Sequence, residues 1–278
     1  MTVNRALAEA TRRLTAAAIP DAPRDARRLL AHVLGIEPGR LTLVLPDPLP
    51  ADAALRFEAV LARRLAREPV SHIIGIRAFY GREFSVTPAV LDPRPETETL
   101  VEVALATPFR RVLDLGTGSG CILLTLLAER PEATGVGTDI SEAALAVARE
   151  NARRLGIATA KFHRADWFGD VTGRFDLIVS NPPYIAAEEM PGLAPELSHE
   201  PRGALTDEGD GLSAYRAIAR AAPGYLEPGG RLLVEIGPTQ GPAVREILCA
   251  AGLEIVALHT DLDQRHRAVE ARAAAPGA

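Results

Sequence analysis

From residue 110 onward the sequence alternates between short apolar runs and segments with helical periodicity, and this alternation limits the fold more than any other feature. The expected strands are 110–116, 133–140, 161–166, 175–183, 230–237, 254–262 and 265–272, and the expected helices are 119–130, 141–156, 211–226 and 241–252. Such alternation predicts an α/β fold whose mostly parallel sheet is covered by helices on both faces. The last two strands are joined by a short turn, so we expect them to be antiparallel.

The segment before residue 75 has a different pattern, which predicts a small helical bundle ending near residue 70. The expected helices are 21–35, stopped by Gly35, and 51–66, separated by the Pro-rich turn 46–52. Residues that we place near the buried faces of these helices are Leu29, Leu30, His32, Val33 and Leu34 in the first, and Leu55, Phe57, Val60, Leu61 and Leu65 in the second.

Residues 72–93 alternate short apolar runs with Gly and charged residues, which predicts a β-hairpin. A Pro-bounded loop and a helix should follow in 93–105. We therefore divide the chain into an N-terminal helical domain (1–74), a hairpin linker (75–92) and a main domain (93–278). The terminal AAAPGA, residues 273–278, is expected to be loosely attached.

Charge and cysteine content exclude several classes of protein. The net charge is -5, but residues 1–77 hold 12 Arg and 8 Asp/Glu (+4) and the rest holds 19 Lys+Arg and 28 Asp/Glu (-9). The negative net charge of the whole chain counts against non-specific nucleic-acid binding. The two cysteines form no CxxC pair, so neither a disulfide framework nor a metal site is expected. With no signal-peptide pattern and no long apolar span, we expect a cytoplasmic protein that does not bind membranes.

A Gly-rich turn lies between the first strand and the first helix of the alternating region. It comprises Gly116, Thr117, Gly118, Ser119 and Gly120, and its glycines allow a ligand to approach the backbone closely. Asp139 ends the next strand, where a carboxylate can accept both hydroxyls of a ribose; alternatively it caps the helix that follows. Asp166 and Trp167 end the third strand. Asp166 could meet a base amino group, and Trp167 could cover a base or be an ordinary core aromatic.

The fourth strand runs directly into Ser180-Asn181-Pro182-Pro183-Tyr184. The prolines either simply end the strand, since they lack the N–H that a ladder needs, or hold a rigid polar clamp. In open α/β sheets, ligands bind at the carboxyl ends of strands near the topological switch point. The Gly-rich turn, Asp139, Trp167 and Asn181 all fall at such ends, and this convergence favours the clamp.

A Gly-rich turn, a ribose acid and an NPPY motif together resemble the class I S-adenosylmethionine-dependent methyltransferases, which have a Rossmann-like seven-stranded sheet. The NPPY motif marks members that methylate a planar amide or an exocyclic amino nitrogen. More narrowly, the chain is similar to the HemK/PrmC family of release factor glutamine methyltransferases over about residues 20–272. The similarity rests on the following motifs in order: PVSHIIGIRAFYG, VLDPRPETETLVE, VLDLGTGSGCI, SNPPYI, EPRGALTDEGDGLSAYR and LEPGGRLLVEIGPTQ.

This resemblance implies N5-methylation of the glutamine in the Gly-Gly-Gln motif of class I release factors, and so a role in translation termination. It implies that Asn181 and Pro182 are catalytic and that Asn181, Pro182, Pro183 and Tyr184 hold the glutamine. The N-terminal domain would seat the release factor, and we expect a monomer. The residues implied to contact S-adenosylmethionine are Gly116, Thr117, Gly118, Ser119, Gly120, Asp139, Trp167 and Asn181.

An amide nitrogen is a poor nucleophile because its lone pair is delocalised into the carbonyl. Asn181 Oδ1 and the Pro182 carbonyl could each accept one of its hydrogens, which would fix its position and stabilise the growing positive charge. Tyr184 could pack on the flat amide. His199 could be proposed as a base, but a lone His in a polar loop is more often structural. Arg94 and Glu98 border the expected pocket or form a structural ion pair.

Three other functions stay open. The nearest is glutamine methylation of a ribosomal protein, which would use the same motif. An adenine-N6 nucleic-acid methyltransferase is less favoured because the chain has no basic target-recognition run. A non-catalytic binding module is disfavoured by the intact set of motifs. Asp92, before the PRP sequence, and the C-terminal 261–272 depart from the pattern of the family, which leaves substrate fine-tuning open.

Overall fold

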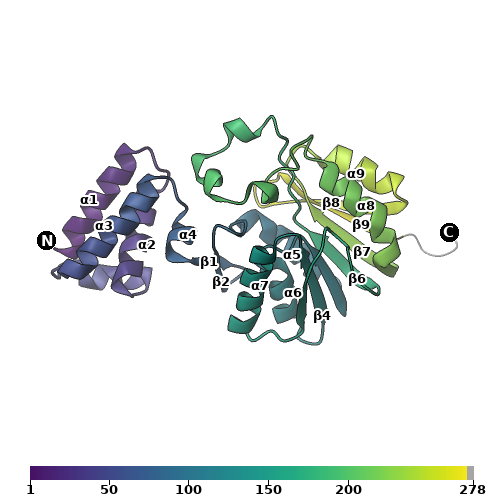
Figure 1. Cartoon of the computed structure of the whole chain (residues 1–278), viewed down its shortest axis with the longest axis horizontal. Helices are drawn as coiled ribbons and strands as arrows, with labels where there is room; N and C mark the ends of the chain where they lie inside the picture. The colour runs from purple at the N-terminus through teal and green to yellow at the C-terminus, as the bar shows by residue number, and fades with distance from the viewer. Residues whose placement is uncertain (274–278) are drawn as a thin grey trace. The chain divides into compact units, whose positions relative to one another are not determined.

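The computed structural model describes residues 1–273, and the chain forms two compact units (Figure 1). Unit 1 contains Met1–Ile76 together with the short segment Ala194–His199. Unit 2 contains Arg77–Leu193 and the chain from Glu200 onward. The prediction for the C-terminal tail from residue 274 lies outside the described residues. None of the helices within residues 1–273 is long and apolar enough to cross a membrane.

Unit 1 is a helical bundle formed by α1 (Val3–Ala16), α2 (Ala22–Leu34), α3 (Ala51–Leu65) and the short α4 (Val70–Ile74), with a 3-10 helix, η1 (Pro38–Val44). Its core includes the fully buried Leu14, Leu30 and Leu61. The predicted stop of α2 at Gly35 is confirmed, because Gly35 has the left-handed φ of 66° that ends helices. Helix α1, which sequence periodicity did not predict, is capped by the Thr2 hydroxyl, which accepts from Arg5 N at 3.3 Å.

Two residues predicted on the buried faces of unit 1 are exposed instead. The side of α3 that is buried carries Ala53, Phe57 and Leu61, which follow one another at intervals of four residues. Leu55 lies two positions from this row, on the opposite side of the helix, and is 75% exposed. On α2, His32 is likewise exposed, while Ala31 is buried.

The predicted hairpin is confirmed as strands β1 (Ile76–Phe79) and β2 (Arg82–Ser85), which belong to unit 2 apart from Ile76. Its turn residues Tyr80 and Gly81 both have positive φ, 47° and 72°, as a two-residue hairpin turn with the twist of the strands requires. Residues 70–74 are helical, so the β-structure begins later than the sequence suggested.

Unit 2 contains a seven-stranded sheet with the order β5-β4-β3-β6-β7-β9-β8. The adjacent pairs from β5 to β7 in this order are parallel, and β9 is antiparallel to both β7 and β8, which confirms the α/β fold and the antiparallel final pair. The strands are β3 (Arg111–Leu115), β4 (Thr134–Asp139), β5 (Ala160–Arg164), β6 (Phe175–Ser180), β7 (Leu226–Glu235), β8 (Leu253–Thr260) and β9 (His266–Ala273).

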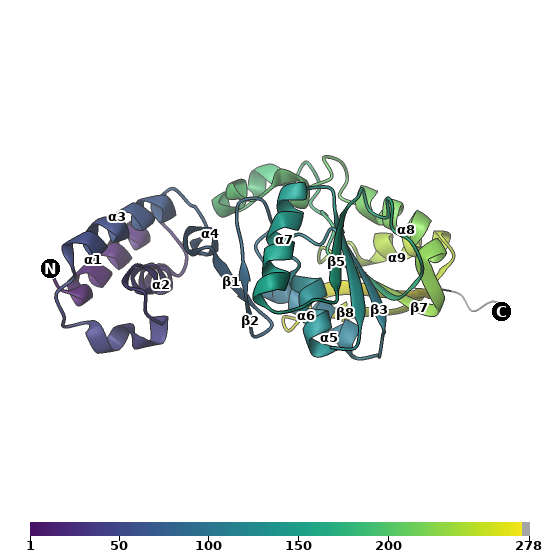
Figure 2. The ribbon, with the colours of Figure 1, turned by 60° about the horizontal axis from the view of Figure 1, so that its bottom comes forward.

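Helices cover both faces of this sheet (Figure 2). Side chains of α5 (Glu98–Leu105), α6 (Cys121–Glu129) and α7 (Glu142–Arg154) pack on one face, in a core that contains Val112 of β3. Those of α8 (Ser213–Tyr225) and α9 (Gly241–Ala250) pack on the other, in a core that contains Leu113. After β3 the chain continues to β4 and β5 on one side of β3, and it then returns to β6 on the other side of β3. The topological switch point therefore lies between β3 and β6.

Further short 3-10 helices lie in the described loops that follow the hairpin. These are η2 (Pro95–Thr97), which precedes α5, and η3 (Met190–Gly192), η4 (Pro195–His199) and η5 (Arg202–Ala204), which lie between β6 and α8, with η4 belonging to unit 1.

Candidate active site

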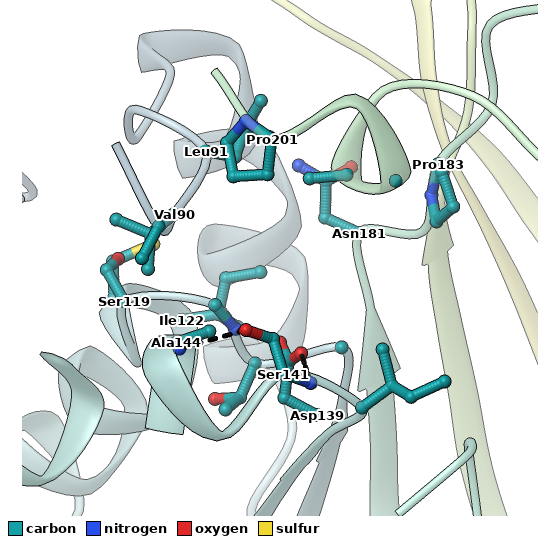
Figure 3. Close-up of a pocket in the computed structure, with 18 of the residues that line it drawn as sticks. Val90, Leu91, Ser119, Ile122, Asp139, Ser141, Ala144, Asn181, Pro183 and Pro201 are labelled. Carbon is teal, nitrogen blue, oxygen red and sulfur yellow. Dashed lines mark hydrogen bonds between the residues drawn. The ribbon is translucent and has the colours of Figure 1, made fainter. Parts of the chain in front are cut away.

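A cavity of about 250 Å³ opens at the carboxyl ends of β3, β4 and β6 in unit 2 (Figure 3). Residues predicted for the site that line it are Gly116, Thr117, Gly118, Ser119, Asp139, Trp167, Asn181 and Pro183. Gly120, Pro182 and Tyr184 were also predicted, but they do not line the cavity. Asn181 and Pro183 lie on a different wall from Asp139 and Ser141 (Figure 3).

The Gly-rich turn takes a backbone path that only glycine adopts readily. Gly116, Gly118 and Gly120 have φ values of 70°, 55° and 79°. A Cβ at Gly120 would lie 3.1 Å from Leu124 Cδ1 and 3.3 Å from the Ala148 Cβ, so Gly120 lets the first turn of α6 pack closely. At Gly118 a Cβ would meet nothing within 4 Å, which leaves its face of the turn open toward the cavity.

Asp139 ties the end of β4 to the Gly-rich turn. Its Oδ2 accepts from Gly118 N at 3.0 Å, and its Oδ1 accepts from Ser141 N at 2.9 Å (Figure 3). Ser141, not Asp139, is the N-cap of α7, since its side chain accepts from Ala144 N. Burial raises the Asp139 pKa, although these backbone donors oppose the rise. Each carboxylate oxygen has a further lone pair, so Asp139 can still accept from a ligand's hydroxyls.

Trp167 lies beside the Gly-rich turn. Its φ is 56°, and its carbonyl accepts from the Thr138 hydroxyl at 2.8 Å, so the backbone holds this uncommon conformation. A Cβ placed on Gly116 would have Trp167 Cζ3 as its nearest neighbour, at 3.9 Å. The ring is partly buried against the sheet core and also forms part of the cavity wall.

Asn181 directly follows β6, whose last residue is tied to β3 because the Ser180 hydroxyl donates to the Leu115 carbonyl at 2.7 Å. The side chain of Asn181 is oriented by Thr97, as Nδ2 donates to the Thr97 Oγ1 at 3.2 Å. Pro182 is buried. The amide oxygen of Asn181 is therefore the end of the side chain that remains available to a ligand.

Tyr184 does not line the cavity, but its backbone is fixed by a residue that sequence reasoning missed. Gln240 Nε2 donates to the Tyr184 carbonyl at 2.8 Å and to the Gly211 carbonyl at 3.2 Å. Gln240 Oε1 accepts from Gly237 N at 2.9 Å. Gln240 thus joins three loops at the end of the sheet. Its only sequence signal is its place just after an expected strand, in the motif GPTQ.

Asn151 is a second residue that the sequence did not reveal. It is fully buried on α7, and its Nδ2 donates to the carbonyls of Ser119 at 2.9 Å and Ser85 at 3.0 Å, while its Oδ1 accepts from Ser85 N at 2.7 Å. One side chain therefore fastens the Gly-rich turn to strand β2. The helical face of α7 predicts burial at this position but gives no hint of these partners.

Four other residues considered from the sequence are placed by their contacts. Arg94 lines the cavity and pairs with Glu200 at 2.5 Å, while Glu98 accepts from Tyr80 N at 2.8 Å, so Arg94 and Glu98 do not form the ion pair considered from the sequence. His199 belongs to unit 1, where its Nε2 lies 3.1 Å from the Ala66 carbonyl. Asp92 is buried near Arg77, 3.5 Å away. Within residues 1–273, no three His, Cys, Asp or Glu side chains are grouped to hold a metal ion.

Solved structures identify the class of the fold. A methyltransferase from Pyrococcus furiosus matches with a TM-score of 0.55 at 16% identity, covering 77% of this chain and 97% of its own. A 16S rRNA N2 G1207 methyltransferase from T. thermophilus matches with a TM-score of 0.51 at 21% identity, covering 71% of this chain and 49% of its own. At these identities the likeness shows the fold alone, and the fold is that of the class I methyltransferases.

Sequence comparisons identify the family. Residues 5–75 match the model of the PrmC N-terminal domain, and residues 91–213 match that of the methyltransferase small domain. A release factor glutamine methyltransferase from Cereibacter sphaeroides is 62% identical over 96% of this chain and 97% of its own length. Another, from Rhodospirillum rubrum, is 45% identical over 100% of this chain and 87% of its own length. The chain belongs to the family of release factor glutamine methyltransferases.

Proposed function

We propose that this protein transfers a methyl group from S-adenosylmethionine to N5 of the glutamine side chain in the Gly-Gly-Gln motif of class I release factors. The observation that carries the proposal is the placement of Asn181. Its amide nitrogen is held by Thr97, and the residue lines the same cavity as the Gly-rich turn. A methyl donor on the turn and an amide held by Asn181 would therefore meet in one cavity. The chain also belongs to a family of glutamine methyltransferases, which agrees with an amide as the methyl acceptor.

The residues of the cavity fit S-adenosylmethionine. When bound, this cofactor supplies a methyl group on an electrophilic sulfonium. The open face of Gly118 admits a ligand to the backbone, the Asp139 carboxylate can accept from the ribose hydroxyls, and the ring of Trp167 can cover a flat base. The lining is mostly apolar, which keeps water away from the reacting atoms.

The Asn181–Tyr184 segment has the chemistry needed for an amide acceptor. The acceptor nitrogen carries two hydrogens, and Asn181 Oδ1 and the Pro182 carbonyl would each accept one. Both dipoles then face the nitrogen on which positive charge grows, and they are held by a rigid Pro-Pro backbone, so little reorganisation is required. In-line transfer needs the nitrogen at roughly 3–3.5 Å from the methyl carbon. A strong general base is not needed, because the methylated nitrogen loses its proton readily after transfer.

We assign unit 1 the task of seating the release factor. Residues 5–75 match the N-terminal domain model of this family, and residues 1–77 carry a net charge of +4 (12 Arg less 8 Asp/Glu). We further propose that the enzyme is a cytoplasmic monomer, with no direct contact to nucleic acid or membrane and no metal requirement.

Methyl transfer from labelled S-adenosylmethionine tests the proposal. Purified release factor, ribosomal proteins and DNA are offered separately, with the Asn181→Ala variant as control. The proposal predicts label on the release factor alone, lost in the variant. Label only on a ribosomal protein would identify that glutamine methyltransferase activity instead, and label only on DNA would identify an adenine methyltransferase. Cofactor binding without transfer to any of the three would contradict the proposed function.

A further inference from the structure

Thr97 is a small buried residue that connects two functional elements of unit 2. It ends the 3-10 helix η2 (Pro95–Thr97), lines the cavity and is only 2% exposed. Its Oγ1 accepts from Asn181 Nδ2 at 3.2 Å, across 84 positions of sequence. Nothing in the motif that contains Asn181 points to this partner.

Glu235 is the other partner of Thr97. It ends β7 and is 1% exposed; burial raises the pKa of its carboxyl group to about 7, and hydrogen bonding from the Thr97 side chain opposes this rise. Its position is fixed by its own backbone, because the Tyr215 hydroxyl donates to the Glu235 carbonyl at 2.8 Å. Within the described chain, the Glu235 Oε2 is buried without a hydrogen-bond partner. Above about pH 7 the group is a buried carboxylate, which is costly, so a structural role alone gives little reason to keep one here.

The direction of these hydrogen bonds follows from the number of protons available. A carboxylate can only accept, and a Thr hydroxyl has a single proton to donate. Above about pH 7, where Glu235 is ionised, the Thr97 proton is given to its carboxylate, and the oxygen of Thr97 can then serve Asn181 only as an acceptor. It therefore selects Nδ2 of the amide, and Oδ1 is left facing the acceptor nitrogen. If the amide were turned over, it would offer N–H donors to a nitrogen that itself carries hydrogens.

We infer that Glu235 and Thr97 are positioning residues that determine which end of the Asn181 amide meets the methyl-accepting nitrogen. The inference rests on the proposed function, since it assigns a direction to the clamp that holds the glutamine. Neither residue needs to touch the substrate nitrogen. Their effect passes through Asn181 and should appear in the rate of transfer more than in the binding of either substrate.

The direct test replaces the Thr97 hydroxyl while keeping its shape. Thr97→Val should lower kcat about 10- to 100-fold, because the amide loses its fixed orientation. The KM for release factor and the affinity for S-adenosylmethionine should stay within about twofold. Thr97→Ser, which retains the hydroxyl, should recover most of the rate. Thr125→Val is the matched control, since Thr125 is fully buried on α6 and its hydroxyl has no partner in the part of the chain that the structure describes. A kcat for Thr97→Val equal to that of Thr125→Val would overturn the inference.

A double-mutant cycle tests the contribution of Glu235. Glu235→Gln alone should lower kcat, since a Gln can donate to Thr97 as well as accept from it and so no longer fixes the direction. In the Thr97→Val background the same change should cause almost no further loss, because the two residues act through one path. Independent, multiplicative losses would contradict coupling through Thr97.

A readout that does not depend on catalysis separates this inference from the proposed function. The side-chain amide protons of Asn181 can be followed by NMR in the full-length protein, and assigned by their loss in Asn181→Ala. We expect protection from exchange in the wild type that is lost in Thr97→Val and retained in Thr97→Ser. If the wild type methylates no release factor, the proposed function fails, whereas unchanged Asn181 protons in Thr97→Val would overturn the positioning role itself.

Discussion

Gly211 lies so close to Tyr184 that a Cβ on Gly211 would be 2.3 Å from the Tyr184 carbonyl oxygen. The same carbonyl accepts from Gln240 Nε2, so the backbone directly after the two prolines is confined from two sides. Gly211, just before α8, and Gln240, after β7, thus fix the backbone of Tyr184, although neither residue lines the cavity.

Gly211→Ala should therefore damage both stability and catalysis. The φ of Gly211 is +73°, which is strained for any residue with a Cβ, and the contact with Tyr184 cannot be relieved by a side-chain rotation. We expect a loss of about 2–4 kcal/mol in the free energy of unfolding and at least a tenfold lower kcat.

Denaturant unfolding and a methyl-transfer assay check this prediction. Gly209→Ala in the same loop is the control, because Gly209 does not have a positive φ and its Cβ would come no closer than 3.4 Å to the Asp207 side chain. Equal effects of the two substitutions would show that Gly211 is not a special contact.

Asp139→Asn should weaken the binding of S-adenosylmethionine. Both oxygens of Asp139 accept from backbone N–H groups, so an amide NH₂ in place of one oxygen would face another donor. The loss of a charged acceptor for the ribose adds to this effect, and together we expect about 10- to 100-fold lower affinity.

Trp167 is the single Trp of the chain and lines the cavity, so its fluorescence provides a native titration signal. Asp170→Asn, at an exposed position nearby in sequence, is the control and should bind as the wild type does. An Asp139→Asn variant with unchanged affinity would remove Asp139 from the cofactor site.

The stability of the protein should decrease as the pH rises from about 4 to 7, and Asp114 should account for part of the decrease. Burial raises the pKa of Asp114 to about 7. The Thr117 hydroxyl, which donates to Asp114 at 2.6 Å, opposes this rise. The folded state therefore holds this proton more tightly than the unfolded state does. Between the unfolded and folded pKa values, each pH unit costs up to about 1.4 kcal/mol from this group.

Urea unfolding of the wild type and of Asp114→Asn at pH values of about 5, 6, 7 and 8 would measure this contribution. The difference in stability between the two proteins should shift in favour of Asp114→Asn as the pH rises. A difference that is constant across the series would mean that Asp114 does not titrate with a raised pKa.

A buried ion-pair cluster should stabilise unit 1. Arg64 is 5% exposed and pairs with Asp25 at 2.7 Å and with Glu196 at 3.1 Å, so the short segment Ala194–His199 is held to the bundle by charge. Arg64→Ala leaves two carboxylates without this partner and should cost about 3 kcal/mol or more.

Hydrogen exchange of α1, α2 and α3 in the full chain would report the loss within unit 1. Arg12→Ala is the control, because the Arg12–Glu9 pair is exposed and such pairs contribute about 0–1 kcal/mol. If both variants exchanged alike, the Arg64 cluster would carry no more stability than a surface pair.

The fold followed from sequence periodicity because local patterns determine local structure. The alternation after residue 110 predicted the strands of the sheet and the antiparallel pairing of β8 with β9. Where the apolar pattern was weak, the prediction failed, and α1 was not recognised. On α3, Leu55 was assigned to the buried side of the helix, whereas in the structure Leu55 is exposed and Arg64 lies on the buried side. An arginine with two carboxylate partners can be buried, but its partners lie far away in sequence.

The motif residues that line the cavity could be predicted for a similar reason, whereas the residues that contact them could not. The Gly-rich turn, Asp139 and Asn181 are recognisable because each stands at the end of a predicted strand. Thr97 and Gln240 act through hydrogen bonds to residues 84 and 56 positions away. Such contacts depend on how the strands and loops are assembled in three dimensions, and no local pattern encodes them.

The most direct test of the account is to locate the methyl group on the product. Release factor is incubated with S-adenosylmethionine and the wild-type enzyme, digested, and the fragment that contains Gly-Gly-Gln is sequenced by tandem mass spectrometry. We expect one added methyl group on the glutamine side chain, and none with Asn181→Ala. A methyl group on any other residue of the release factor, or the same yield from Asn181→Ala, would contradict it.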